Sequence, residues 1–204
     1  MLAQIPPQIQ AEWHPIPVPF AEERFALYPV SLRSYNADMA HASGMTTEQI
    51  EEYLYRSYTR VDGLWFVLAE ERYGFEVALA LDEAVWRVLP KIQARLLQQQ
   101  LGLGPDAAGL VRALQAKLCL DRYEFSLNPV ATQIELTLSR CPWHELLLRS
   151  GRQHLAARLG GVICGVELPA FAREFNCTCS GAPPHRLCGD GGNCVFRFRA
   201  EPKK

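Results

Sequence analysis

The hydrophobic period changes near residue 120, and this change limits the fold more than any other feature of the sequence. Apolar residues recur every three or four positions from Ile50 to Leu118, which is the spacing of amphipathic helices. From Tyr123 to Leu138 they alternate with polar residues, as in half-buried strands. The sequence therefore predicts an α+β fold, in which a helical N-terminal half is followed by an antiparallel sheet with helices.

Local signals mark the ends of the expected helices. Thr46 and Gln49 match a capping box, and Gly74 is a plausible C-terminal stop. Pro90 lies inside the next helical pattern and is expected to kink or divide it near Leu89. Helices are therefore expected over three ranges: 46–73, 75–100 and 106–118.

The second half of the chain reads as strands and helices in turn. Asn128-Pro129 is a turn signal between the two alternating runs, which predicts an antiparallel hairpin. Residues 145–164 are expected to form a loop and then a helix, and a short helix is expected within 165–176 after Pro169. The segment NCVFRFRA predicts a final strand.

Three regions follow from these patterns. Residues 1–45 are rich in proline and are expected to form an extended arm, with one short strand near FALYPVSL. Residues 46–120 form the helical region. Residues 121–204 form an α+β, cysteine-rich region, expected to pack with the helices as one unit.

Charge and hydropathy exclude some functions. The net charge is −1, so the chain as a whole lacks the positive field of a nucleic-acid-binding or membrane-surface protein. No apolar run reaches the roughly 20 residues of a membrane span, and the first residues lack the basic and apolar regions of a signal peptide. We therefore expect a cytoplasmic protein with no nucleic-acid or membrane partner. The aromatic residues of the arm and the first helix favour a homodimer.

Six of the seven cysteines lie after residue 140, and this uneven distribution is the main functional signal. Structural disulfides are rare in the reducing cytoplasm, so the alternatives are a metal site, ordinary buried thiols or a reactive thiol. Histidine is present and the dense cysteine run of ferredoxins is absent, which favours zinc over an iron–sulfur cluster. The expected ligands are Cys141, Cys164, Cys188 and Cys194, with Cys179 and His144 as substitutes.

Cys141 is also the best candidate for a catalytic nucleophile. It lies where a strand is expected to end and a helical segment to begin, with His144 three residues further on. Such a position can lower the pKa of a thiol and activate it. The alternative is that CPW is a turn whose tryptophan packs in the core.

Carboxylates and a tryptophan on the first two helices could form a binding pocket. Asp62 is flanked by Val61 and by Leu64-Trp65, so it could face inward, and Asp82 lies on the next helix. Asp62, Trp65 and Asp82 are therefore candidate contacts for a small-molecule ligand. The alternative is that the carboxylates are solvated charges on helix surfaces.

Several stretches resemble a known group of proteins. They are DGLWFVLAEERYGFEVALALDEAVWRVLPKIQARLL, CPWHELLLRSGR, Cys164, FAREFN and GDGGNCVFRF. Over about residues 46–200 the chain resembles an uncharacterised family of prokaryotic cytosolic proteins. That family is similar to the 2-aminothiazoline-4-carboxylate hydrolase-like proteins and, more remotely, to the 4-vinyl reductase-type small-molecule-binding domain. The resemblance implies an α+β domain that encloses a small ligand, with Cys141, Cys164 and Cys194 as the matching thiols.

Three functional hypotheses follow. The first is a cytosolic small-molecule-binding protein with a cysteine-ligated metal, zinc before an iron–sulfur cluster. The second is a hydrolase of a cyclic C–N bond of the thiazoline type, in which zinc-bound water or the Cys141 thiolate attacks the substrate. The third is a homodimeric interaction protein without catalysis.

Overall fold

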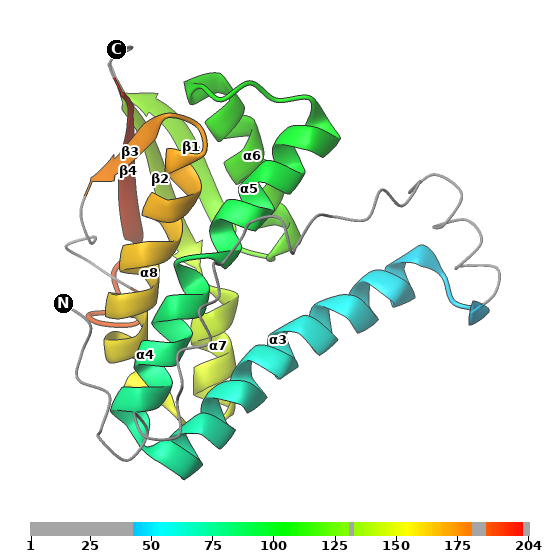
Figure 1. The fold of residues 1–204 in the computed structure, drawn as a ribbon, viewed down its shortest axis with the longest axis vertical. Coiled ribbons are helices and arrows are strands. Elements are labelled where there is room, and N and C mark those ends of the chain that lie inside the picture. Colours follow the sequence, from blue (N-terminus) through cyan, green and yellow to red (C-terminus); the bar gives the residue numbers. More distant parts are fainter. Residues whose placement is uncertain (1–42, 131–132, 181–186, 202–204) are drawn as a thin grey trace, which may run out of the picture. The chain divides into compact units, whose positions relative to one another are not determined.

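The computed structural model describes residues 43–130, 133–180 and 187–201 and confirms the α+β fold (Figure 1). The arm expected at residues 1–45 and the strand expected near FALYPVSL lie almost entirely outside these ranges. In chain order the elements are α3 (Thr47–Tyr73), α4 (Phe75–Trp86), α5 (Leu89–Leu101), α6 (Ala107–Leu120), β1 (Glu124–Val130), β2 (Gln133–Arg140), α7 (Pro142–Arg149), the 3₁₀ turn η2 (Gln153–Leu155), α8 (Ala156–Arg173), β3 (Cys177–Ser180) and β4 (Cys194–Ala200).

The predicted boundaries of α3, α4 and α5 are confirmed to within a few residues, and each has a local cause. The loop expected from residue 145 is wrong, because Pro142–Arg149 form α7. The Thr46 hydroxyl accepts a hydrogen bond from the Gln49 amide, and the Gln49 side chain accepts one from the Thr46 amide, so the capping box of α3 is complete. Gly74 ends α3 with φ of 84°, a left-handed value that glycine adopts without strain. Pro90 occupies the first turn of α5, where its missing amide breaks no helical hydrogen bond, so the pattern divides into α4 and α5.

The four strands form one antiparallel sheet in the order β1-β2-β4-β3. One face of the sheet is apolar, because Leu136 and Leu138 of β2 and Phe196 and Phe198 of β4 are buried there. The neighbouring residues of β4, including Arg197, point to the opposite face and are more exposed. The strand predicted at NCVFRFRA is therefore confirmed.

Helices α6 and α8 supply the rest of the core. They pack against the sheet, with α6 beside β1 and α8 beside β3, and α5 contacts both helices. The core contains residues from two helices and the sheet. They are Leu110, Leu114 and Leu118 of α6, Phe171 and Ala172 of α8, and the inward residues of β2 and β4. Phe171 and Phe175 stack with their ring centroids 5.7 Å apart.

The chain divides into two compact units, Met1–Ala78 and Leu79–Lys204. The first unit contains α3 and the start of α4, and the second contains α5, α6, the sheet, α7 and α8. The division therefore falls inside α4 and not near residue 120, because α5 and α6 share one hydrophobic core with the strands that follow them.

The turn predicted at Asn128-Pro129 is wrong. These two residues lie within β1, paired with Glu135 and Ile134. Pro129 is tolerated there because β1 is an edge strand of the sheet, where a missing amide donor need not cost a ladder hydrogen bond.

Pro169 does not begin a new helix. It lies inside α8, which continues from Ala156 to Arg173. Proline removes the amide that would bond the carbonyl of Gly165, and Gly165 is exposed, so water can solvate that carbonyl.

Candidate functional site

Four cysteines that were predicted as metal ligands lie in one region of the second unit. Cys164 lies on α8, and the thiols of Cys141, Cys188 and Cys194 are near enough to affect its pKa. We call these four residues the thiol cluster. They come from a strand end, a helix, a turn and a strand that are separated by up to 53 positions in the numbering, so only the tertiary fold brings them together. None of them is in a disulfide.

Cys141 is the N-cap residue of α7, at the junction of β2 and α7. Burial raises the pKa of the Cys141 thiol to about 11, while the backbone amides of His144 and Trp143 and the hydroxyl of Tyr123 act in the opposite direction. The net shift is away from the activated thiolate that the nucleophile hypothesis requires. Catalysis by Cys141 and His144 therefore stays a prediction, without support from the electrostatics of this site.

Cys188 packs directly on α8. A Cβ atom placed on Gly160 would lie 2.3 Å from the Cys188 sulfur, so the close approach depends on glycine at this position. Gly160 and Cys164 are four residues apart and share one helix face. The Cys188 thiol is thereby held on the same side of α8 as Cys164.

Cys194 completes the thiol cluster from β4. Its side chain is buried, and its sulfur accepts a hydrogen bond from the Leu187 amide at 3.3 Å. This bond connects the beginning of β4 to the turn that carries Cys188. Burial also raises the pKa of Cys164 well above its ordinary value, so at neutral pH the Cys164 thiol is protonated in the absence of a cation.

A buried ionic network borders the thiol cluster. The Lys117 ammonium of α6 lies 2.6 Å from Asp121 and 2.9 Å from Glu167 of α8, which is three residues from Cys164. Burial alone lowers the pKa of Lys117, but the two carboxylates outweigh burial and hold it above its ordinary value. Burial also raises the pKa of Tyr123, which lies near Cys141 and Glu167.

This network was not predicted from the sequence. Its signal was the charged Lys117 in the apolar stripe of α6, between Leu114 and Leu118. A lysine in that position must be neutral or paired when the helix is buried. The identity of its partner Glu167 could not be read from the local sequence, because it lies 50 positions further on in the numbering.

The remaining predicted site residues are dispersed. Trp65 lies on α3 and is 67% exposed. Asp62 lies on the same helix in the first unit, whereas Asp82 lies on the part of α4 that belongs to the second unit. Both carboxylates are partly buried. Their role as contacts for a small molecule stays a prediction.

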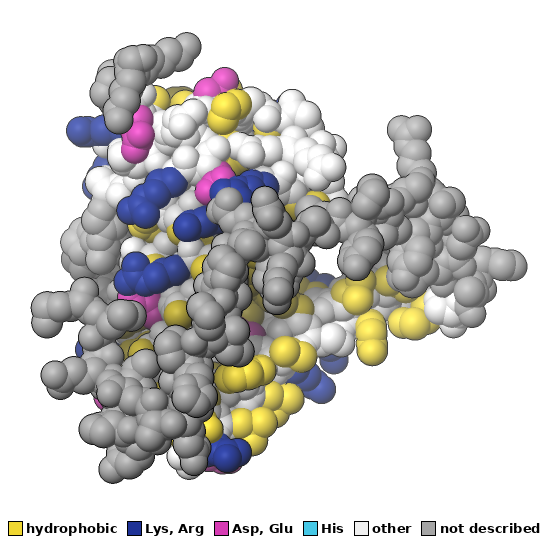
Figure 2. Space-filling view, in the orientation of Figure 1, with side chains coloured by type: hydrophobic (Ala, Val, Ile, Leu, Met, Phe, Trp, Pro, Cys, Tyr) yellow, Lys and Arg dark blue, Asp and Glu magenta, His cyan; other side chains and the backbone are white. Residues whose placement is uncertain are grey.

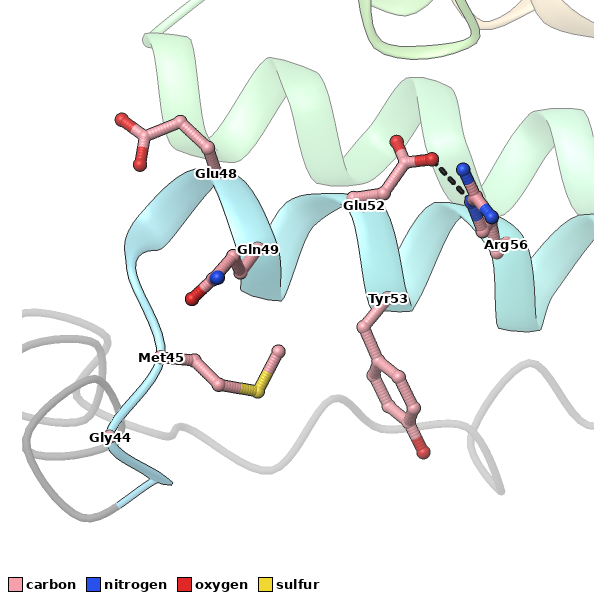
Figure 3. A pocket seen from close by; sticks show the side chains of 7 residues that line it. All are labelled: Gly44, Met45, Glu48, Gln49, Glu52, Tyr53 and Arg56. Atoms are coloured by element: carbon pink, nitrogen blue, oxygen red, sulfur yellow. Dashed lines mark hydrogen bonds and ion pairs between the residues drawn. The ribbon is translucent and has the colours of Figure 1, made fainter.

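An open depression follows the first turns of α3 (Figure 3). It is lined by Gly44, Met45, Glu48, Gln49, Glu52, Tyr53 and Arg56. Glu52 and Arg56 form an ion pair along the helix. None of the predicted site residues lines this depression.

Two further observations concern metal and membrane. Within residues 43–130, 133–180 and 187–201, no three His, Cys, Asp or Glu side chains are arranged to hold a metal ion as they stand. The segment Gln153–Arg173 is long and apolar enough to cross a membrane by length and composition alone. One third of that window is buried, and α8 contacts α5 and β3.

Comparison with family models finds a match over just under half of the chain. A family model described as "Family of unknown function (DUF6125)" matches residues 45–145. No curated protein matches.

A solved structure of a trafficking protein particle complex subunit 3 from Naegleria fowleri, covalently bound to palmitic acid, is similar at 13% sequence identity. Its TM-score is 0.48, with 74% of this chain and 97% of that chain covered. A likeness of this size carries no function from one protein to the other. The resemblance to hydrolase-like and 4-vinyl reductase-type proteins is not tested by these matches.

Proposed function

We propose that this protein binds one soft metal ion, with zinc as the preferred ion, through the thiol cluster. The observation that supports the proposal most directly is that three other cysteines are electrostatic neighbours of Cys164. Four thiolates are a common ligand set for a structural zinc ion, which accepts tetrahedral sulfur coordination. A small-molecule ligand beside this ion remains part of the proposal only through the resemblance of the sequence.

The arrangement of the thiol cluster indicates what binding would require. Because the described side chains are not already arranged as a metal centre, the thiols must move on binding. A cysteine side chain turns about a single torsion, χ1, between staggered positions. Such rotations, together with a small shift of the turn that carries Cys188, are the change that we propose.

The thiols of this site are expected to ionise only when a cation binds to them. Burial keeps Cys141 and Cys164 protonated at neutral pH. A bound divalent ion would stabilise the thiolates and release their protons, so metal affinity would rise with pH. The ion would connect β2, α8 and β4 and thereby stabilise the second unit.

Metal analysis tests the proposal. Protein purified without added metal, or dialysed against zinc and then freed of excess zinc, is expected to contain about one zinc per chain by mass spectrometry of the elements. The Cys164→Ser variant is expected to lose this zinc. Cys119→Ser is the matched control, because Cys119 is exposed and lies on α6.

Cobalt gives a second readout. Thiolate-bound cobalt absorbs strongly through charge transfer from sulfur, so wild-type protein and Cys119→Ser are expected to show this band and Cys164→Ser is not. The proposal is wrong if folded wild-type protein binds neither ion in stoichiometric amount. It is also wrong if Cys164→Ser binds zinc and cobalt as the wild type does.

A further inference from the structure

Helix α3 carries a row of exposed apolar side chains along one face (Figure 2). Five large residues of this row are between 55% and 67% exposed: Leu54, Val61, Leu64, Trp65 and Leu68. An exposed apolar surface of this length is typical of an interaction site and is uncommon on a protein that acts alone.

Another side of α3 is already buried. Thr59 and Ala69 are buried. The ring of Phe66 contacts that of Phe75 edge to face, with the centroids 5.9 Å apart. The row of exposed apolar residues is therefore separate from the buried side of the helix.

The exposed side has the spacing of a coiled coil. Apolar or small residues recur at alternating intervals of four and three positions, which is the heptad period of 3.5 residues. We call these positions the α3 seam: Ile50, Leu54, Ser57, Val61, Leu64 and Leu68. No charged residue interrupts the α3 seam.

We propose that a second copy of this chain covers the α3 seam, and that the two α3 helices pair in parallel and in register. In this arrangement each seam residue packs beside the same residue of the second copy. The inference goes beyond the proposed metal site and does not depend on it, because the α3 seam lies in the first unit and the thiol cluster lies in the second.

Charge complementarity favours the parallel arrangement. In a parallel pair, a residue that borders the seam on one helix lies beside the residue five positions further on in the second copy. Arg60 therefore lies beside Trp65 of the second copy, which places a cation next to an aromatic ring. No two like charges meet along this border. Antiparallel pairing that keeps the same six seam residues would place Arg60 opposite Arg60 of the second copy, and like charges in that position repel.

The exposed area is sufficient for a stable pair. Five large side chains exposed by more than half present about 600 Å² per chain, so that a dimer buries roughly 1,200 Å² in all, the lower end of specific interfaces. A two-stranded seam of about three heptads is short for a free peptide. Here α3 is already folded as part of its own unit.

Light scattering on the full chain at several concentrations tests the pairing. The wild type is expected to have twice the mass of one chain. Val61→Glu places a charge in the middle of the seam and is expected to halve that mass, with an unchanged circular dichroism spectrum. Arg56→Glu introduces the same residue on another side of α3 and is expected to remain a dimer.

Leu64→Gln is a second variant that can be used if Val61→Glu does not fold, because it makes a milder polar change on the same seam. It is expected to shift the monomer–dimer equilibrium towards monomer by at least tenfold. A wild type that is monomeric at every concentration overturns the proposal. A dimer that neither seam variant weakens also overturns it.

Cross-linking tests the orientation. In a Cys119→Ser background, Leu54→Cys and Leu68→Cys lie at opposite ends of the seam and are each expected to form a disulfide between copies under mild oxidation. In antiparallel pairing these two positions would be far from their own copies and only a central position such as Val61→Cys would link. That outcome overturns the parallel arrangement.

Discussion

The sulfur of Cys188 lies against the backbone of Gly160, so closely that a Cβ atom at residue 160 would be 2.3 Å from it. This contact ties the turn before β4 to the middle of α8. It is also the point at which the helix leaves room for a thiol beside Cys164.

The first prediction concerns this contact. Gly160→Ala is expected to displace Cys188 and to lower the free energy of unfolding by about 1–3 kcal/mol, measured by urea denaturation. Gly165→Ala is the control on the same helix, since no atom lies within 4 Å of its added Cβ. It is expected to be neutral or stabilising by up to about 1 kcal/mol. Equal effects of the two changes would contradict the close packing at Gly160.

The second prediction concerns the buried lysine. Lys117→Met removes the cation between Asp121 and Glu167 and is expected to cost about 3–5 kcal/mol, because the Glu167 carboxylate is then left buried without its partner. Arg87→Met breaks the exposed ion pair with Glu83 and is expected to cost at most about 0.5 kcal/mol. Chemical denaturation measures both. A small loss for Lys117→Met would contradict a stabilising buried ion pair between Lys117 and Glu167.

The third prediction concerns alkaline pH. Burial raises the pKa of the Cys179 thiol from 9.0 to about 12. Above pH 9 the unfolded chain loses this proton before the folded protein does, so the free energy of unfolding falls as pH rises from 9 towards 12. The slope is at most about 1.4 kcal/mol per pH unit for one thiol. Cys179→Ala is expected to reduce this slope when stability is measured at several pH values.

The slope of unfolding free energy against pH is compared between the wild type and two variants. Cys119→Ala is the control, because Cys119 is exposed, and it is expected to leave the wild-type slope unchanged. If Cys179→Ala and the wild type have the same slope, the thiol of Cys179 is not buried in solution.

The fourth prediction concerns removal of the proposed metal. A strong zinc chelator is expected to lower the melting temperature of the wild type by several degrees, because binding to the folded state alone stabilises it. Cys164→Ser, which has lost one of the four proposed ligands, is expected to melt at the same temperature with and without chelator. A chelator effect of equal size in both proteins would place the metal elsewhere.

The sequence by itself determined the parts of this fold whose causes are local. Thr46 and Gln49 begin α3 through a reciprocal hydrogen bond over four residues, and Gly74 ends the helix through its own backbone freedom. The segment NCVFRFRA predicted the strand β4. Such features depend on neighbours within one turn of helix or one strand, so the local sequence is sufficient to predict them.

Only the tertiary structure decided where the thiols and charges meet. Pro169 is tolerated inside α8, and the predicted break does not occur, because the carbonyl that loses its donor belongs to the exposed Gly165. Lys117 is buried because Glu167 reaches it from another helix. The thiol cluster exists because the sheet brings Cys141 and Cys194 towards α8. These contacts join residues far apart in the chain, and their energies depend on packing and burial that local spacing does not contain.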